Sequence, residues 1–174
     1  LASGQLDLAV LNLPLPSRDL VATQLFTEDL VLVVPVDHPL TARPLPLPLT
    51  ILGELPLLVP LPGTAFRDEL DAAILPAGIV LSPTAEIDGL RLIASLTFEG
   101  YGPAVLPATA IPASMRERFR ALAVEGLPPR RVGVAQRSRG LPSAPTRALI
   151  ELLQSVVREA GDLPHGLHPA TDGR

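Results

Sequence analysis

The sequence contains no cysteine and no lysine, and aromatic residues make up only 3% of its 174 residues. Without cysteine, these residues can form no disulfide, no thiol nucleophile and no cysteine-based metal site. The lack of lysine excludes a Schiff-base enzyme, and no G-x-S-x-G motif is present. The scarcity of aromatic side chains argues against the stacking platforms that bind single-stranded nucleic acids.

Positive charge is also limited. Fourteen arginines face 18 acidic residues, which gives a net charge of −4, so the chain as a whole has no basic footprint for phosphates. Its only basic cluster is Arg130-Arg131 with Arg137-Ser138-Arg139, which flanks one predicted strand. We interpret it as a solvated sheet edge that discourages pairing between sheets, with nucleic-acid contact as the minor alternative.

Long apolar runs are missing too. Proline or a charge interrupts every apolar stretch before the roughly 18 residues that a membrane-spanning helix needs. The first ten residues carry neither a basic segment nor a cleavage site for a signal peptide. The chain starts with Leu1 in the middle of a strand pattern, and we therefore expect a fragment of a longer protein that works in the cytoplasm.

What the sequence does contain is aliphatic, since 47% of it is hydrophobic, enough for one domain or two small lobes. Apolar runs bounded by proline, glycine or charge predict strands at 6–11, 21–26, 29–36, 57–59, 79–85, 104–106, 119–124 and 132–136. Helical spacing predicts helices near 50–53, over 65–75, after 88 and from 143 to 160. This alternation favours an α/β fold with mainly parallel pairing, and the continuous first run is typical of a strand buried on both faces.

Capping residues mark three of the helix starts: Thr64, Asp88 and Ser143, the last with Pro145 in its first turn. In the last helix a buried stripe is predicted for Leu149, Leu152, Leu153 and Val156. The tail, 161–174, has no periodicity, and we expect it to be disordered.

Four stretches in this order resemble the effector-binding domain of LysR-type transcriptional regulators. They are Gly4-Gln5-Leu6-Asp7-Leu8-Ala9-Val10, Glu28 to Pro35 running into Asp37-His38-Pro39-Leu40, Pro62-Gly63-Thr64, and Gly100-Tyr101-Gly102-Pro103-Ala104-Val105-Leu106-Pro107. The resemblance implies a two-lobed fold similar to type 2 periplasmic binding proteins. Lobe I, incomplete here, would hold 1–35 and 125–160, and lobe II would hold 36–124.

The same resemblance implies a function. A small, anionic metabolite would bind in a cleft between the lobes and change transcription. The family's winged helix-turn-helix is absent from this chain, so DNA would be contacted only through that missing part, in a full-length homodimer or tetramer. Neither cofactor, catalytic residue, metal nor membrane is expected.

Helix N-termini are the expected anchors, because their free N–H groups favour an anion. The candidate ligand-binding residues are Asn12, Gly63, Thr64, Phe66, Glu86, Asp88, Tyr101 and Gly102.

Structural interpretations compete with these assignments. Thr64 and Asp88 are suited to capping a helix, Glu86 to a solvated strand end, and Asn12 and Gly102 to turns. His38 before Pro39 is expected to be structural, and His165 with His168 lacks the third ligand of a metal site.

Two other classes of function share some of these features. A periplasmic-type solute-binding receptor of a transporter would have the same general fold but needs a secretion signal. An enzyme would need a nucleophile with a base, and the acids Glu86 and Asp88 give no sign of separate roles.

Overall fold

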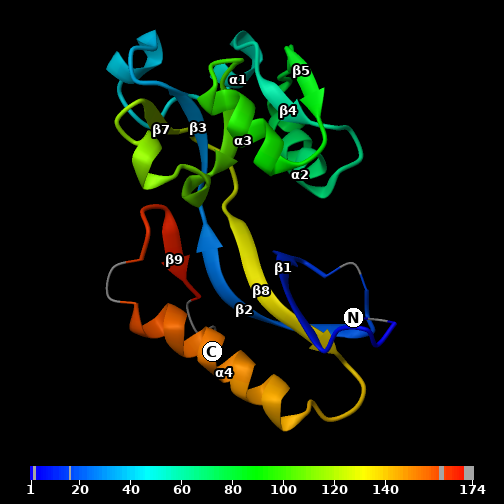
Figure 1. The fold of residues 1–174 in the computed structure, drawn as a ribbon. Helices are drawn as coiled ribbons and strands as arrows, with labels where there is room; N and C mark the ends of the chain where they lie inside the picture. Colours follow the sequence, from blue (N-terminus) through cyan, green and yellow to red (C-terminus); the bar gives the residue numbers. More distant parts are fainter. Residues whose placement is uncertain (2, 16, 161–162, 171–174) are drawn as a thin grey trace. The chain divides into compact units, whose positions relative to one another are not determined.

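The computed structural model describes residues 1, 3–15, 17–160 and 163–170. The chain divides into two compact units, which are drawn in Figure 1. Unit 1 comprises Leu1–Glu28 and Pro129–Arg174, and unit 2 comprises Asp29–Pro128. The chain therefore passes between the units twice, after Glu28 and after Pro128. That these units act as hinged lobes stays a prediction.

Unit 1 is built on an antiparallel sheet in the order β1-β8-β2-β9. Its strands are β1 (Leu8–Leu13), β2 (Leu20–Glu28), β8 (Arg130–Arg137) and β9 (Leu167–Pro169). The expectation of a first strand buried on both faces of a parallel sheet is wrong. β1 is an antiparallel strand at the sheet edge, and its residues are half-buried apart from the exposed Val10.

Strand β8 lies in the middle of this sheet, between β1 and β2. The interpretation of its flanking arginines as edge protection is therefore wrong. Arg130 donates from Nε to Glu28 Oε2 at 2.7 Å, and this carboxylate, at the end of β2, is only 1% exposed. At Gly133 a Cβ atom would lie 2.8 Å from the Thr23 carbonyl oxygen, so close packing requires glycine there.

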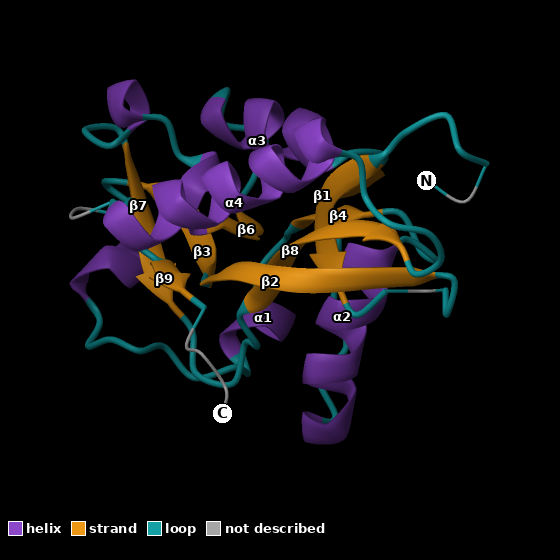
Figure 2. Ribbon diagram, turned by 90° about the horizontal axis from the view of Figure 1, so that it is seen from below, coloured by secondary structure: helices purple, strands orange, loops and turns teal. Residues whose placement is uncertain are grey.

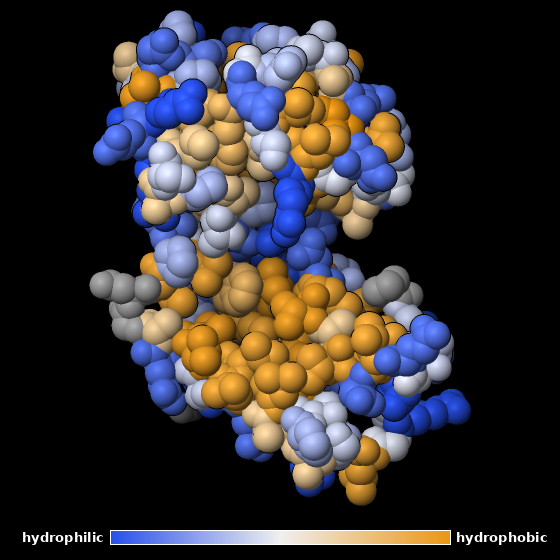
Figure 3. Space-filling view, viewed as in Figure 1, coloured by the Kyte–Doolittle hydropathy of each residue, from blue (hydrophilic) through white to orange (hydrophobic). Residues whose placement is uncertain are grey.

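Helix α4 (Ala144–Glu159) packs against β2. The predicted start is confirmed, because the Ser143 hydroxyl accepts from the Thr146 N–H and proline follows in the first turn. The predicted buried stripe is wrong, since Leu149, Leu152 and Val156 are 43%, 57% and 59% exposed and Leu153 is only half-buried. Figure 3 shows apolar side chains gathered on the viewed face of unit 1.

The expectation of a disordered tail is wrong for its described residues, because a strand forms there. Strand β9 pairs antiparallel with the end of β2, and His168 lies opposite Thr27. Residues 161–162 and 171–174 of the tail lie outside the described residues, and with them the position just after the predicted helix.

Unit 2 is built on a mixed sheet in the order β5-β4-β6-β3-β7. Its strands are β3 (Leu30–Pro35), β4 (Leu58–Pro60), β5 (Ala85–Ile87), β6 (Ala104–Pro107) and β7 (Phe119–Ala123). Its α-helices are α1 (Ile51–Glu54), α2 (Ala65–Ile74) and α3 (Leu90–Phe98), and 3-10 turns occupy Pro39–Ala42, Leu75–Ala77, Ala108–Ala110 and Ala113–Met115.

Alternation along β3 divides the core of unit 2 into two layers. Leu30, Leu32 and Val34 face the layer that contains α1 and α2, while Val31 and Val33 face the layer that contains α3. The sheet is thus covered by helices on both faces, and Figure 2 shows these helices in purple beside the orange strands.

The α/β fold is confirmed, but mainly parallel pairing is wrong. Among the strands named here, β4 pairs in parallel with β5 and β6, whereas β3 runs antiparallel to both of its neighbours. The reason is connectivity: parallel neighbours need a crossover such as α2 or α3, and most strands here are not joined in that way. The strand predicted at 79–85 shrinks to Ala85–Ile87.

His38 has the structural role expected of it. Its Nδ1 accepts from the Leu40 N–H at 3.3 Å and caps the turn Pro39–Ala42. In the described part of the chain no helix combines the length and apolar character that crossing a membrane requires.

Candidate ligand-binding site

Two parallel strands of unit 2 end side by side. Pro60, the last residue of β4, lies opposite Ile87, the last residue of β5, and the Leu61 N–H donates to the Ile87 carbonyl at 3.2 Å. Each strand leads into a helix, and α2 and α3 cover opposite faces of the sheet. In open α/β sheets, ligands bind outside the carboxyl ends of strands where the helices diverge in this way.

The N-terminus of α2 has open backbone donors. No side chain caps this helix, and its first backbone bond runs from the Asp68 N–H to the Thr64 carbonyl. Among the described residues, the N–H groups of 65–67 therefore have no partner, as expected for the first turn of an uncapped helix. Together with the helix dipole, these donors favour a carboxylate or another anion.

Thr64 occupies the N-cap position but does not cap with its side chain, so that part of its prediction is wrong. Its hydroxyl donates to the Leu61 carbonyl at 2.8 Å, and its N–H donates to the same oxygen at 3.3 Å. These bonds close the turn around Pro62-Gly63. Gly63 has φ of 79°, which glycine adopts without strain, and a Cβ there would meet no atom within 4 Å.

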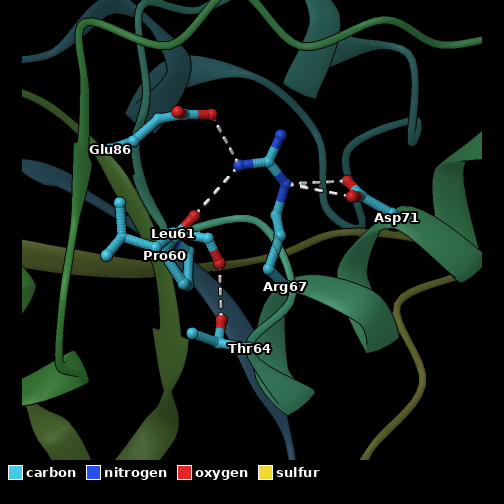
Figure 4. A network of polar contacts seen from close by, with 6 residues as sticks. All are labelled: Pro60, Leu61, Thr64, Arg67, Asp71 and Glu86. Atoms are coloured by element: carbon cyan, nitrogen blue, oxygen red, sulfur yellow. Dashed lines mark hydrogen bonds and ion pairs between the residues drawn. The ribbon is translucent and has the colours of Figure 1, made fainter.

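Arg67 is the centre of a polar network that ties α2 to β4 and β5 (Figure 4). Its Nε lies 3.0 Å from both carboxylate oxygens of Asp71. Its Nη1 donates to the Pro60 carbonyl and to Glu86 Oε1, each at 3.0 Å. Because the Arg67 side chain is only 13% exposed, the network fixes the first turns of α2 against the strand ends.

Electrostatics keep Arg67 charged. Burial by itself lowers its pKa, but the hydrogen bonds and charges of Glu86 and Asp71 outweigh burial, so the pKa of Arg67 is raised above its ordinary value. A raised pKa that is already far above neutrality means that Arg67 carries a constant positive charge at physiological pH.

Glu86 is therefore an ion-pair partner of Arg67. Its side chain is 38% exposed, and its charge is balanced by a guanidinium 3.0 Å away. Asp88 is exposed and does not cap α3: the helix begins at Leu90, the N-cap residue is Gly89 with φ of 91°, and no side chain caps it. Asp68 likewise places an exposed carboxylate in the first turn of α2, so acidic side chains do not distinguish the two helix ends.

The remaining predicted residues are spread over the fold. Tyr101 is 64% exposed after α3, and a Cβ on Gly102 would lie 3.3 Å from the Pro56 carbonyl, which supports the structural interpretation of that glycine. Phe66 is 6% exposed in the core beside α2, so its side chain packs inward. Asn12 belongs to unit 1, where it lies on β1 and is paired with Val132 of β8.

Sequence reasoning did not single out Arg67. Arg67 and Asp71 have the i,i+4 spacing of a helical ion pair, so the sequence alone could have indicated this contact. The link to Glu86, 19 residues away, depends on the pairing of β4 with β5. No group of three or more His, Asp or Glu side chains suited to a metal ion occurs within the described ranges.

Comparison with known proteins identifies the family of this fold. The model of the LysR substrate binding domain matches residues 1–158. A curated "Probable hydrogen peroxide-inducible genes activator" of Streptomyces viridosporus is 33% identical over 168 residues, which are 94% of this chain and 53% of that protein. The chain thus spans about half the length of the curated relatives it matches.

Solved structures agree with this match. The OxyR C206S mutant of Corynebacterium glutamicum, H2O2-bound, is 25% identical with a TM-score of 0.71, over 91% of this chain and 51% of that one. The regulatory domain of CcmR from Synechocystis PCC6803, in complex with 2-PG, has a TM-score of 0.79 at 21% identity, over 90% of this chain and 76% of that one. The chain belongs to the LysR family of transcriptional regulators, within its substrate binding domain.

Proposed function

We propose that this chain senses a small anionic metabolite and that the ligand's anionic group binds at the N-terminus of α2. The observation that carries the proposal is the uncapped first turn of α2, with open N–H groups at 65–67, beside the carboxyl ends of β4 and β5. Arg67, neutralised by Asp71 and Glu86, holds the start of α2 at the strand ends, and the Gly63 turn leaves the backbone accessible.

Two structures of this fold are described as complexes with small molecules: CcmR with 2-PG, and the effector binding domain of QuiR with shikimate, a carboxylate. They support a metabolite as the kind of ligand for this chain. Whether the ligand also lies in a cleft between two lobes stays a prediction.

Peroxide sensing by a thiol does not fit this sequence, although several relatives are named as hydrogen peroxide-inducible genes activators. Oxidation of cysteine needs a cysteine thiolate, and these 174 residues contain none. The proposed signal is therefore reversible binding, in which the ligand favours one arrangement of the protein over another.

The rest of the proposal concerns the longer protein. We infer that it works in the cytoplasm as a homodimer or tetramer and contacts DNA through a helix-turn-helix outside this chain. Catalysis is not part of the proposal. The matched relatives include transcriptional regulators, so a solute-binding receptor is not favoured.

The test is calorimetric titration of the chain with a panel of small carboxylates that includes shikimate. For any ligand that binds, Thr64→Val should weaken binding about fivefold or more, because loss of the hydroxyl bond to Leu61 loosens the turn that presents the α2 donors.

Thr84→Val is the matched control. Its hydroxyl makes the same kind of bond, to the Pro56 carbonyl at 2.9 Å, but just before β5, at the other end of that strand. Equal affinities of both variants and the unmodified chain would contradict the proposed site, and so would a panel without any saturable ligand.

A further inference from the structure

Unit 1 contains a polar cavity, distinct from the end of α2, that nothing above uses. Its volume is about 150 Å³, well over the ~15 Å³ needed for one water molecule. It lies where β8 ends and the chain turns into α4, and Asp7, just before β1, also lines it. A small organic acid therefore has room there.

The carboxamide of Gln136 brings an unpaired acceptor to this cavity. Gln136 is on β8, the central strand, and its Oε1 is buried without a hydrogen-bond partner in the described structure. Buried polar atoms are nearly always paired, so an orphaned oxygen on a residue that lines a cavity suggests a donor that reaches it when the side chain turns toward the cavity. A hydroxyl group is such a donor.

Two arginines supply positive charge around the same space. Arg137 lies 3.7 Å from Asp7, whose carboxylate is 72% exposed and partly balances it. Arg139 has no ion-pair partner among the described residues. With one acid against two guanidinium groups, the lining has a net positive charge, which suits a carboxylate.

Hydroxyl groups complete the lining. Thr146 is 6% exposed, and its hydroxyl lies 2.8 Å from that of Ser143. Ser143 already caps α4 by accepting from the Thr146 N–H. The end of this helix is thus satisfied, and the case for a ligand rests on the arginines and the buried carboxamide.

We propose that this cavity of unit 1 binds a small hydroxycarboxylate. The carboxylate is held by Arg137 and Arg139, and the hydroxyl donates to Oε1 of Gln136. One ligand of this class satisfies both the free guanidinium and the orphaned oxygen, whereas a simple carboxylate satisfies only the first.

The test is an NMR titration of the chain with glycolate, using acetate as the matched ligand without a hydroxyl group, at constant ionic strength. Glycolate should produce saturable shifts in the side-chain amide of Gln136 and in amides of 139–146. Acetate should bind about fivefold more weakly, since it lacks one hydrogen bond to the protein.

Variants separate this site from nonspecific binding. Arg139→Gln, at an exposed position, should weaken glycolate about tenfold, while Arg91→Gln, an exposed arginine of unit 2, should leave it unchanged. Gln136→Leu should remove the preference for glycolate over acetate, and its melting temperature serves as the folding check. Shifts that do not saturate, an unchanged affinity in Arg139→Gln, or equal binding of both ligands would overturn the proposal.

Discussion

The ion pair between Glu28 and Arg130 should dominate the stability of unit 1. Glu28 is 1% exposed, the Arg130 side chain is 21% exposed, and their atoms approach to 2.7 Å at paired positions of β2 and β8. Glu28→Ala leaves a largely buried guanidinium without its carboxylate. Breaking a buried pair in this way costs about 3–5 kcal/mol, and the partial exposure of Arg130 favours the lower end.

That cost is large beside the roughly 5–15 kcal/mol that stabilises a typical domain. Because the chain has no tryptophan, unfolding is followed by circular dichroism in urea and by hydrogen exchange of the amides in β2 and β8. Both readouts should report the loss, and exchange should rise in unit 1 rather than in unit 2.

Two further variants make the reasoning refutable. Replacing both partners by leucine should recover much of the loss, since no unpaired charge remains. Glu86→Ala, which breaks the more exposed pair with Arg67, should cost no more than about 1 kcal/mol. If Glu28→Ala lowers the free energy of unfolding by less than about 1 kcal/mol, no more than Glu86→Ala does, the account of a stabilising buried ion pair is refuted.

Three other predictions concern packing and charge. Gly133→Ala should destabilise unit 1 by about 1–3 kcal/mol in urea unfolding, because its Cβ would meet the Thr23 carbonyl at 2.8 Å; an unchanged midpoint would contradict this close approach. Leu152→Glu should change stability by less than about 0.5 kcal/mol and reduce binding of a hydrophobic dye, since Leu152 is 57% exposed; a large loss of stability would mean that the residue is buried. Arg67→Ala should cost about 1–2 kcal/mol, discounted for its partly exposed partners, with no change in that cost between pH 6 and 8; a cost that varies over this range would contradict its constant charge.

Local signals in the sequence predicted many of the elements. The β-branched run Leu30–Pro35 forms a buried strand, and Ser143 with the following proline marks the start of α4. These predictions succeed because propensity, capping and burial agree within one segment.

Where a partner is distant in the sequence, local patterns do not suffice. Periodicity places Leu149, Leu152 and Val156 on one face of α4 but does not say whether that face is covered. Strand direction has the same limit, because β1 and β2 pair with β8, more than a hundred residues later. The acidic side chain of Asp88 suggested a cap, whereas the backbone turns at Gly89, so the helix begins without it.

For the candidate site, sequence reasoning located the turn Gly63-Thr64 but did not identify the network behind it. Thr64 and Glu86 are held in bonds to Leu61 and Arg67, and these contacts depend on the register of β4 and β5. The register of two strands cannot be read from a sequence pattern. The pattern therefore indicates residue types suited to a site, but not which of their atoms already form hydrogen bonds within the protein.

The most direct test is a crystal structure of the chain with a carboxylate ligand identified by the calorimetric screen. The account predicts the carboxylate within hydrogen-bond distance of the backbone N–H groups of 65–67, at the first turn of α2. A ligand that makes no contact with 61–67 would contradict it.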